Sequence, residues 1–124
     1  MEGVNWLALI VGVVAGFALG FVIYGPWGFQ KGWAKGSRLE GMAPGTMPMG
    51  AMVWQIGALA LLALVIAMTA ATDALGVAIA AILAVAAQAG AVGAWAQKTG
   101  YAISVDVGYA LGAGALMIVA HALI

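Results

Sequence analysis

The pattern of hydrophobic and polar positions divides the chain into four long apolar segments and one long polar loop. The segments cover residues 4–24, 51–72, 74–96 and 104–123, and Asp106 is the single Asp, Glu, Lys or Arg within them. About 20 helical residues, each rising ~1.5 Å, match the ~30 Å hydrocarbon layer of a bilayer. We therefore predict an all-α integral membrane protein whose four transmembrane helices form an antiparallel bundle.

The longest link, residues 25–50, contains all three prolines and is predicted to be an interfacial loop between the first and second spans. Aromatic residues alternate there with lysines, which is typical of a segment that lies on a membrane surface. Aromatic side chains also occur at both ends of the first span, at the level expected for lipid headgroups. The predicted interfacial anchors are Trp6, Tyr24, Trp27, Phe29, Lys31, Trp33 and Lys35.

The other links indicate how the spans follow one another. The second and third spans meet at Thr72-Asp73, which requires a tight hairpin, and one of these two residues is expected to cap the third helix. An antiparallel path places the first and third links on the same side of the membrane, and these links hold all four basic residues. They are Lys31, Lys35, Arg38 and Lys98. The positive-inside rule makes this side cytoplasmic, so both termini are expected on the non-cytoplasmic side.

Composition narrows the class of protein further. The chain has 124 residues, of which 66% are hydrophobic and 6% charged, and its formal net charge is zero. We interpret residues 1–124 as a single membrane domain, and so neutral a chain is not expected to bind nucleic acid. The first apolar segment is longer than the about 7–15 residues of a signal-peptide core and no basic residue precedes it, so we expect it to be a retained span.

Glycine spacing predicts where helices approach one another closely. Gly12, Gly16 and Gly20 recur every four residues on the first span, and Gly108 and Gly112 repeat the spacing on the last. Faces without side chains let two helix backbones come together, which favours association inside a bilayer. We expect the first ridge to be a contact surface, either within the bundle or against another protein. The alternative is that it reflects only the general glycine content of membrane helices.

The polar residues within the spans are the remaining candidates for a site. Gln55, Gln88, Asp106 and His121 are interpreted as buried polar contacts, with Asp106 expected to pair with Lys98 or to cap its helix. An intramembrane carboxylate or amide could instead line a path for protons or solutes. The first span lacks the carboxylate on which small multidrug exporters depend, so that mechanism is not expected here.

No residues of the chain form a recognisable catalytic, cofactor or metal constellation. There is one histidine and no cysteine, so His121 has no obvious partner for a metal or a haem. Met42, Met47, Met49 and Met52 could offer soft thioether ligands to Cu(I), but they follow no strict spacing. We therefore predict no catalytic residue, no cofactor and no metal site.

The N-terminal third resembles a known family. It begins Asn5-Trp6-Leu7-Ala8 and continues, after the first span, as Tyr24-Gly25-Pro26-Trp27-Gly28-Phe29-Gln30-Lys31-Gly32-Trp33. These stretches, with Gly108-Tyr109 in the last span, are similar to the bacterial four-helix membrane family called domain of unknown function 1761. The chain departs from that family at Ile23, where a Trp is frequent, and at Ala110, where a His commonly follows Gly-Tyr. The resemblance implies a four-helix fold in a bacterial inner membrane and assigns no activity.

The sequence is therefore compatible with two functions. The first is a non-enzymatic membrane protein that packs through Gly/Ala-rich helix faces, as an accessory or structural subunit of a larger assembly or as a homo-oligomer. The second is a small oligomeric transporter or channel for a solute or an ion, since four short helices alone enclose little space. The partners expected in either case are membrane lipid and other membrane-protein subunits or further copies of the chain.

Overall fold

The computed structural model describes residues 3–25, 28–37 and 49–124, and these residues form helices and no strands. The helices are α1 (Trp6–Tyr24), α2 (Gln30–Gly36), α3 (Met49–Ala71), α4 (Leu75–Trp95) and α5 (Gly100–Leu123). Of these, α1, α3, α4 and α5 are long and apolar enough to cross a membrane. The prediction of an all-α protein with four such helices is confirmed.

Side-chain caps explain where two of the long helices begin. The side chain of Asn5 accepts a hydrogen bond from the backbone N–H of Ala8 at 3.0 Å, and the hydroxyl of Thr99 accepts one from Ala102 at 3.2 Å. The expected cap on α4 is wrong, because Ala74 occupies the N-cap position and its side chain makes no cap bond. The residue before it, Asp73, instead makes the turn by adopting a left-handed φ of 53°.

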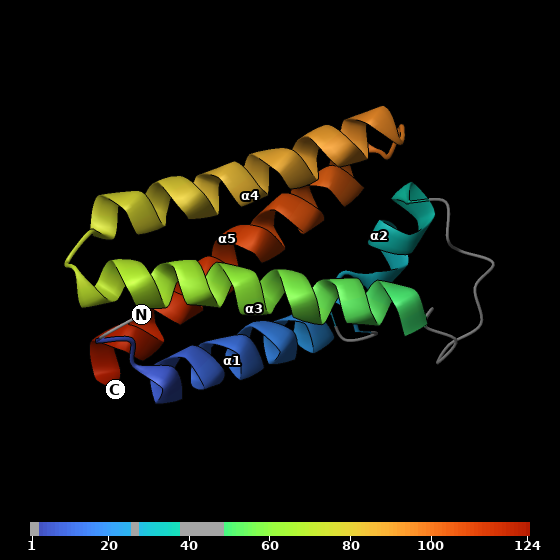
Figure 1. Cartoon of the computed structure of the whole chain (residues 1–124). Helices are drawn as coiled ribbons and strands as arrows, with labels where there is room; N and C mark the ends of the chain where they lie inside the picture. Colours follow the sequence, from blue (N-terminus) through green and yellow to red (C-terminus); the bar gives the residue numbers. More distant parts are fainter. Residues whose placement is uncertain (1–2, 26–27, 38–48) are drawn as a thin grey trace.

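Figure 1 shows the two chain termini at the same end of the molecule as the turn between α3 and α4. The opposite end holds α2, the end of α1, the start of α3 and the link between α4 and α5. Helices α1 and α5 run in opposite directions, because Gly12 near the start of α1 faces Met117 whereas Gly20 near its end faces Tyr109. The functional groups described below gather at these two ends.

The glycine ridge of α1 is used inside the molecule. A Cβ atom on Gly12 would lie 3.1 Å from Met117 of α5, and one on Gly16 would lie 3.2 Å from Leu59 of α3. Both glycines are buried. The ridge is therefore a contact surface between α1 and its neighbours α3 and α5, and close approach of the helices depends on the missing side chains.

The two glycines of the second predicted pair, Gly108 and Gly112, differ in their contacts. A Cβ on Gly112 would lie 2.9 Å from Leu19 of α1, so this position is part of the same close contact. Gly108 is exposed, and a Cβ there would meet no atom of the described residues within 4 Å. The prediction that Gly108 packs against a helix is wrong for the single chain, because it lies on the outer side of α5.

Apolar side chains fill the middle of the bundle and separate its two ends. The buried cluster combines residues of α3, α4 and α5 with partly buried residues of α1. Its largest fully buried side chains are Ile66 of α3 and Met117 of α5. Many large apolar side chains lie on the outer faces of the long helices instead, with Trp54 80% and Leu61 66% exposed. This inside-out distribution suits helices whose outer faces contact lipid.

Candidate functional site

A carboxylate at one end of the bundle gathers three donors from different parts of the chain. The hydroxyl of Tyr24 donates to Oδ1 of Asp106 at 2.6 Å, and the indole N–H of Trp33 donates to the same oxygen at 2.8 Å. The ammonium group of Lys98 lies 2.9 Å from Oδ2, in an ion pair whose side chains are 23% and 17% exposed for Lys98 and Asp106. We call Tyr24, Trp33, Lys98 and Asp106 the carboxylate cluster.

The carboxylate cluster joins the end of α1, the helix α2, the link before α5, and α5 itself. Charge-assisted hydrogen bonds are among the stronger polar contacts in proteins. The cation and the two neutral donors offset part of the cost of removing this carboxylate from water. The prediction that Asp106 pairs with Lys98 is confirmed, while Tyr24 and Trp33 as further donors were not foreseen.

The aromatic rings of the carboxylate cluster also pack against one another and against the neighbouring Tyr109. The rings of Tyr24 and Trp33 meet edge to face with centroids 4.8 Å apart, and the rings of Tyr24 and Tyr109 do so at 5.5 Å. The Lys98 ammonium also lies 5.7 Å from the centre of a Trp33 ring, a distance at which cation–π attraction operates. Such packing holds the donors in place around Asp106.

The predicted interfacial anchors divide into two groups. Phe29, Lys31 and Lys35 are exposed on the outer side of α2, and Trp6 is 52% exposed at the start of α1. Tyr24 and Trp33 instead turn their polar atoms inward to Asp106. Interfacial anchoring by Trp33 stays a prediction, and its indole N–H donates to the partly buried carboxylate of Asp106.

The last predicted anchor, Trp27, lies outside the described residues, as do Arg38, Met42 and Met47.

A glycine spacing within α2 explains how Trp33 reaches Asp106. A Cβ on Gly32 would lie 2.5 Å from the ring of Tyr101, and one on Gly36 would collide with the side chain of Thr99. The Gly36 carbonyl also accepts a hydrogen bond from the Thr99 N–H at 3.1 Å. Helix α2 can thus lie directly on the start of α5. The four-residue spacing of Gly28, Gly32 and Gly36 is the sequence signal for this contact, whereas the sequence pattern predicts a segment that lies on the membrane surface.

A second polar contact lies deeper in the bundle. The Tyr109 hydroxyl donates to the backbone carbonyl of Gly16 at 2.9 Å, and the amide of Gln55 donates to the Tyr109 oxygen at 3.3 Å. This contact is possible because Gly16 has no side chain to shield its carbonyl. The prediction of a polar contact for Gln55 is confirmed, although the residue as a whole is exposed.

Gln88 does not form the buried polar contact that was predicted for it, within the described residues. It lies on the outer face of α4, is exposed, and makes no side-chain hydrogen bond to any residue that the structure describes. The physical reason is the direction of its helix face, since α4 turns Ala78, Ile82 and Ala86 to the core. Gln88 lies on the opposite side, where only lipid or another protein can reach it.

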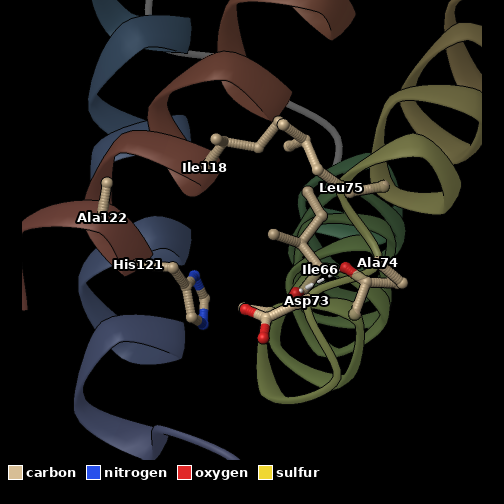
Figure 2. A pocket seen from close by; sticks show the side chains of 10 residues that line it. Ile66, Asp73, Ala74, Leu75, Ile118, His121 and Ala122 are labelled. Carbon is tan, nitrogen blue, oxygen red and sulfur yellow. Dashed lines mark hydrogen bonds between the residues drawn. The ribbon is translucent and has the colours of Figure 1, made fainter.

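The opposite end of the bundle holds a cavity of about 270 Å³ between α3, α4 and α5. Figure 2 shows the imidazole of His121 on one side of it and the carboxylate of Asp73 on the other, pointing toward one another. The Nδ1 atom of His121 lies 3.0 Å from the carbonyl of Met117. Its Nε2 atom is buried and has no partner among the described residues. The prediction of a buried polar contact for His121 is thus met at one ring nitrogen only.

The two polar ends are not one site. Asp106 lies near the start of α5, Tyr109 closer to its middle and His121 near its end. About 18 Å therefore separate Tyr109 from His121 at ~1.5 Å per helical residue. Ile66 and Met117 are fully buried between them. Within residues 3–25, 28–37 and 49–124, no three His, Cys, Asp or Glu side chains gather as metal ligands would.

Comparison with protein-family models, with curated proteins and with solved structures gives no match to this chain.

Proposed function

We propose that this chain is a non-enzymatic multi-pass membrane protein that associates with a further copy of itself through the outer face of α4. In this proposal the four long helices span the membrane in antiparallel order, in a bacterial inner membrane as the family resemblance implies. The carboxylate cluster serves as an internal clamp that holds α2 and the helix ends together. The observation that carries the proposal is the unpartnered amide of Gln88.

Gln88 lies in a part of α4 where water cannot satisfy it. The midpoint of α4 is residue 85, so Gln88 lies about 4.5 Å from the middle of the span. An amide without a hydrogen-bond partner in hydrocarbon is costly. A hydrogen bond between helices relieves this cost by about 0.6–2 kcal/mol. Because an amide both donates and accepts, two copies related by a twofold axis can satisfy each other through the same residue.

The surroundings of Gln88 suit close helix contact. The exposed residues one turn away on the same face of α4 are Ala84 and Ala91 on one side of it and Val85 and Val92 on the other. The two alanines allow the backbones of two helices to approach on their side of the amide. By contrast, the glycine ridge of α1 is occupied inside the chain and does not support a partner contact. The Gly/Ala-rich face expected from the sequence is therefore assigned to α4.

The alternative of a solute or ion transporter finds less support in the geometry. A path across one chain would have to join the polar groups at its two ends, and Ile66 and Met117 are fully buried between them. A path between copies would have to run along α4, where Gln88 is the only strongly polar side chain of the outer face between Leu75 and Trp95. A single amide favours a contact over a conducting route.

The association can be tested by cross-linking, because the chain has no cysteine of its own. Ala84→Cys places a thiol on the proposed face, and Leu61→Cys places one on an exposed position of α3 as the matched control. In native membranes we expect oxidation to give disulfide-linked dimers from Ala84→Cys and monomers from Leu61→Cys. Adding Gln88→Leu to Ala84→Cys should lower the dimer yield.

Two results would contradict this assignment. Equal dimer yields from Ala84→Cys and Leu61→Cys would mean random collisions in the membrane. A cross-linked product of Ala84→Cys with a mass unlike that of two copies would move the interface to a different membrane protein. Solute uptake by vesicles that contain the purified protein, absent from empty vesicles, would favour the transporter instead.

A further inference from the structure

The cavity beside His121 is the strongest unassigned feature of the molecule. Its walls combine apolar side chains with three polar residues, Thr69 and Asp73 from α3 and the turn, and His121 from α5. Thr69 is 8% exposed and therefore buried. The cavity lies at the end of the bundle that holds the α3–α4 turn and the two termini (Figure 1). A mostly apolar cavity with three polar groups could hold a ligand that is itself part apolar and part polar.

The hydrogen bonds of His121 determine which of its atoms can bind a ligand. The Met117 carbonyl can only accept, so Nδ1 of His121 carries the proton of their 3.0 Å hydrogen bond. In the neutral ring, Nε2 then carries a lone pair and can only accept. This atom is buried and without a partner among the residues that the structure describes. Buried acceptors are nearly always paired, so an unpaired one indicates a missing donor.

The remaining polar groups of the cavity, the exposed Asp73 and the buried Thr69, also offer acceptors. The carboxylate of Asp73 faces His121 across the cavity (Figure 2) and is an acceptor when ionised. The Thr69 hydroxyl donates a hydrogen bond to the Ile66 carbonyl at 2.8 Å, so its oxygen can only accept a further hydrogen bond. Three acceptors and no free side-chain donor therefore line the cavity, within the described part of the chain.

We propose that this cavity binds the ammonium group of an amphiphilic primary amine. A primary ammonium has three N–H donors and no acceptor, and it carries the positive charge that the Asp73 carboxylate can pair with. His121 Nε2 and the Thr69 oxygen would take the remaining donors. The apolar side chains of Ile66, Leu75 and Ile118 line the same cavity and would contact the tail.

Alternative ligands fit these groups less well. Among the described residues that line the cavity, a divalent metal would find one imidazole and one carboxylate, short of the usual three or four protein ligands. An anion would face the carboxylate directly. A quaternary ammonium has the charge but no N–H to donate, so it would leave His121 Nε2 unpaired.

The difference between primary and quaternary amines supplies the test. The protein is purified into phosphatidylcholine nanodiscs, and its thermal unfolding is followed by the fluorescence of its tryptophans. We expect octylamine to raise the midpoint in a saturable manner, while octyltrimethylammonium, with the same tail and charge, has little effect. Equal shifts from both compounds would overturn the proposal, because they would reflect surfactant action or charge alone.

Two variants locate the effect. Asp73→Asn keeps the shape of the side chain, and Asn tolerates the left-handed φ of 53° at this position. We expect it to bind octylamine about tenfold more weakly, as the loss of a charge-assisted contact predicts. His121→Phe keeps a ring but removes the acceptor and should weaken binding as well. Ser104→Ala, at the other end of α5, should bind as the unaltered chain does.

Unchanged octylamine binding by both Asp73→Asn and His121→Phe would place the ligand elsewhere and refute the proposal. The source of the ammonium is resolved by a second comparison, between nanodiscs of phosphatidylethanolamine and phosphatidylcholine, whose headgroups differ in the methyl groups on nitrogen. Stabilisation by phosphatidylethanolamine that Asp73→Asn abolishes identifies a lipid headgroup. Stabilisation by octylamine alone identifies a free amine. These results are independent of the cross-linking at α4.

Discussion

Replacing Gly16 with Leu tests the packing of the bundle most directly. A Cβ at this position would already lie 3.2 Å from Leu59 Cδ2 and 3.5 Å from Ala113 Cβ, so the rest of a leucine side chain has no space. Overpacking of this kind costs about 1–3 kcal/mol. The substitution would also push Tyr109 away from the Gly16 carbonyl, to which it donates at 2.9 Å. Loss of that bond costs about 0.5–1.5 kcal/mol more.

The expected total is therefore about 1.5–4.5 kcal/mol of unfolding free energy. Gly57→Leu is the matched control, because a Cβ on Gly57 would meet no described atom within 4 Å. Both substitutions raise the hydrophobicity of a span and remove a helix-weakening glycine, so both chains should insert into the membrane. We expect Gly57→Leu to keep or raise the unfolding midpoint and Gly16→Leu to lower it by several degrees.

The assay is thermal unfolding in mild detergent, followed by circular dichroism, with the amount of protein in the membrane fraction as the measure of insertion. If Gly16→Leu unfolds at the same temperature as Gly57→Leu or higher, the close contact of α1 with α3 and α5 does not exist. The glycine ridge would then reflect composition alone.

Three further predictions concern the carboxylate cluster, the docking of α2 and the membrane orientation. Tyr24→Phe removes one donor to Asp106 and should lower the unfolding free energy by about 1.5–3 kcal/mol, measured by thermal unfolding with Phe21→Tyr as an exposed control on the same helix. Gly36→Leu should displace α2 from Thr99, because a side chain at this position would collide with Thr99. In a chain whose other tryptophans are replaced by Phe, the fluorescence emission of Trp33 should then shift toward that of hydrated tryptophan. Unchanged emission would contradict the docking of α2 on α5. A reporter active only in the cytoplasm, fused after Ile124, should remain silent, and a strong signal would reverse the proposed orientation.

The number and extent of the membrane-spanning helices could be predicted from the sequence because hydropathy and length act locally. The predicted spans 51–72 and 74–96 differ from α3 and α4 by at most two residues at each end. The last span is the exception, since α5 begins at Gly100 and not at residue 104. Its start depends on the Thr99 cap, a polar side chain that hydropathy does not register.

The site could be predicted only where two of its members lie close together in the sequence. Lys98 and Asp106 are eight residues apart, and their pairing follows from that proximity and from opposite charge. Tyr24 and Trp33 reach the same carboxylate from 82 and 73 residues away, so their role depends on how α1 and α2 pack. The two glutamines pose the same problem, because nothing in the local sequence distinguishes Gln55 of α3, which is hydrogen-bonded to Tyr109, from Gln88 of α4, which has no such partner among the described residues.

The helix faces that point outward are those that the packing of the four long helices does not use. The glycines of α1 contact α3 and α5 inside the bundle. The alanines on the core side of α4 are buried together with Ile82. What remains outward on α4 is Gln88 with Ala84 and Ala91 on one side of it and Val85 and Val92 on the other. Lipid hydrocarbon cannot pair with the amide of Gln88. The proposed contact between two copies would satisfy that amide with the same residue of the second chain.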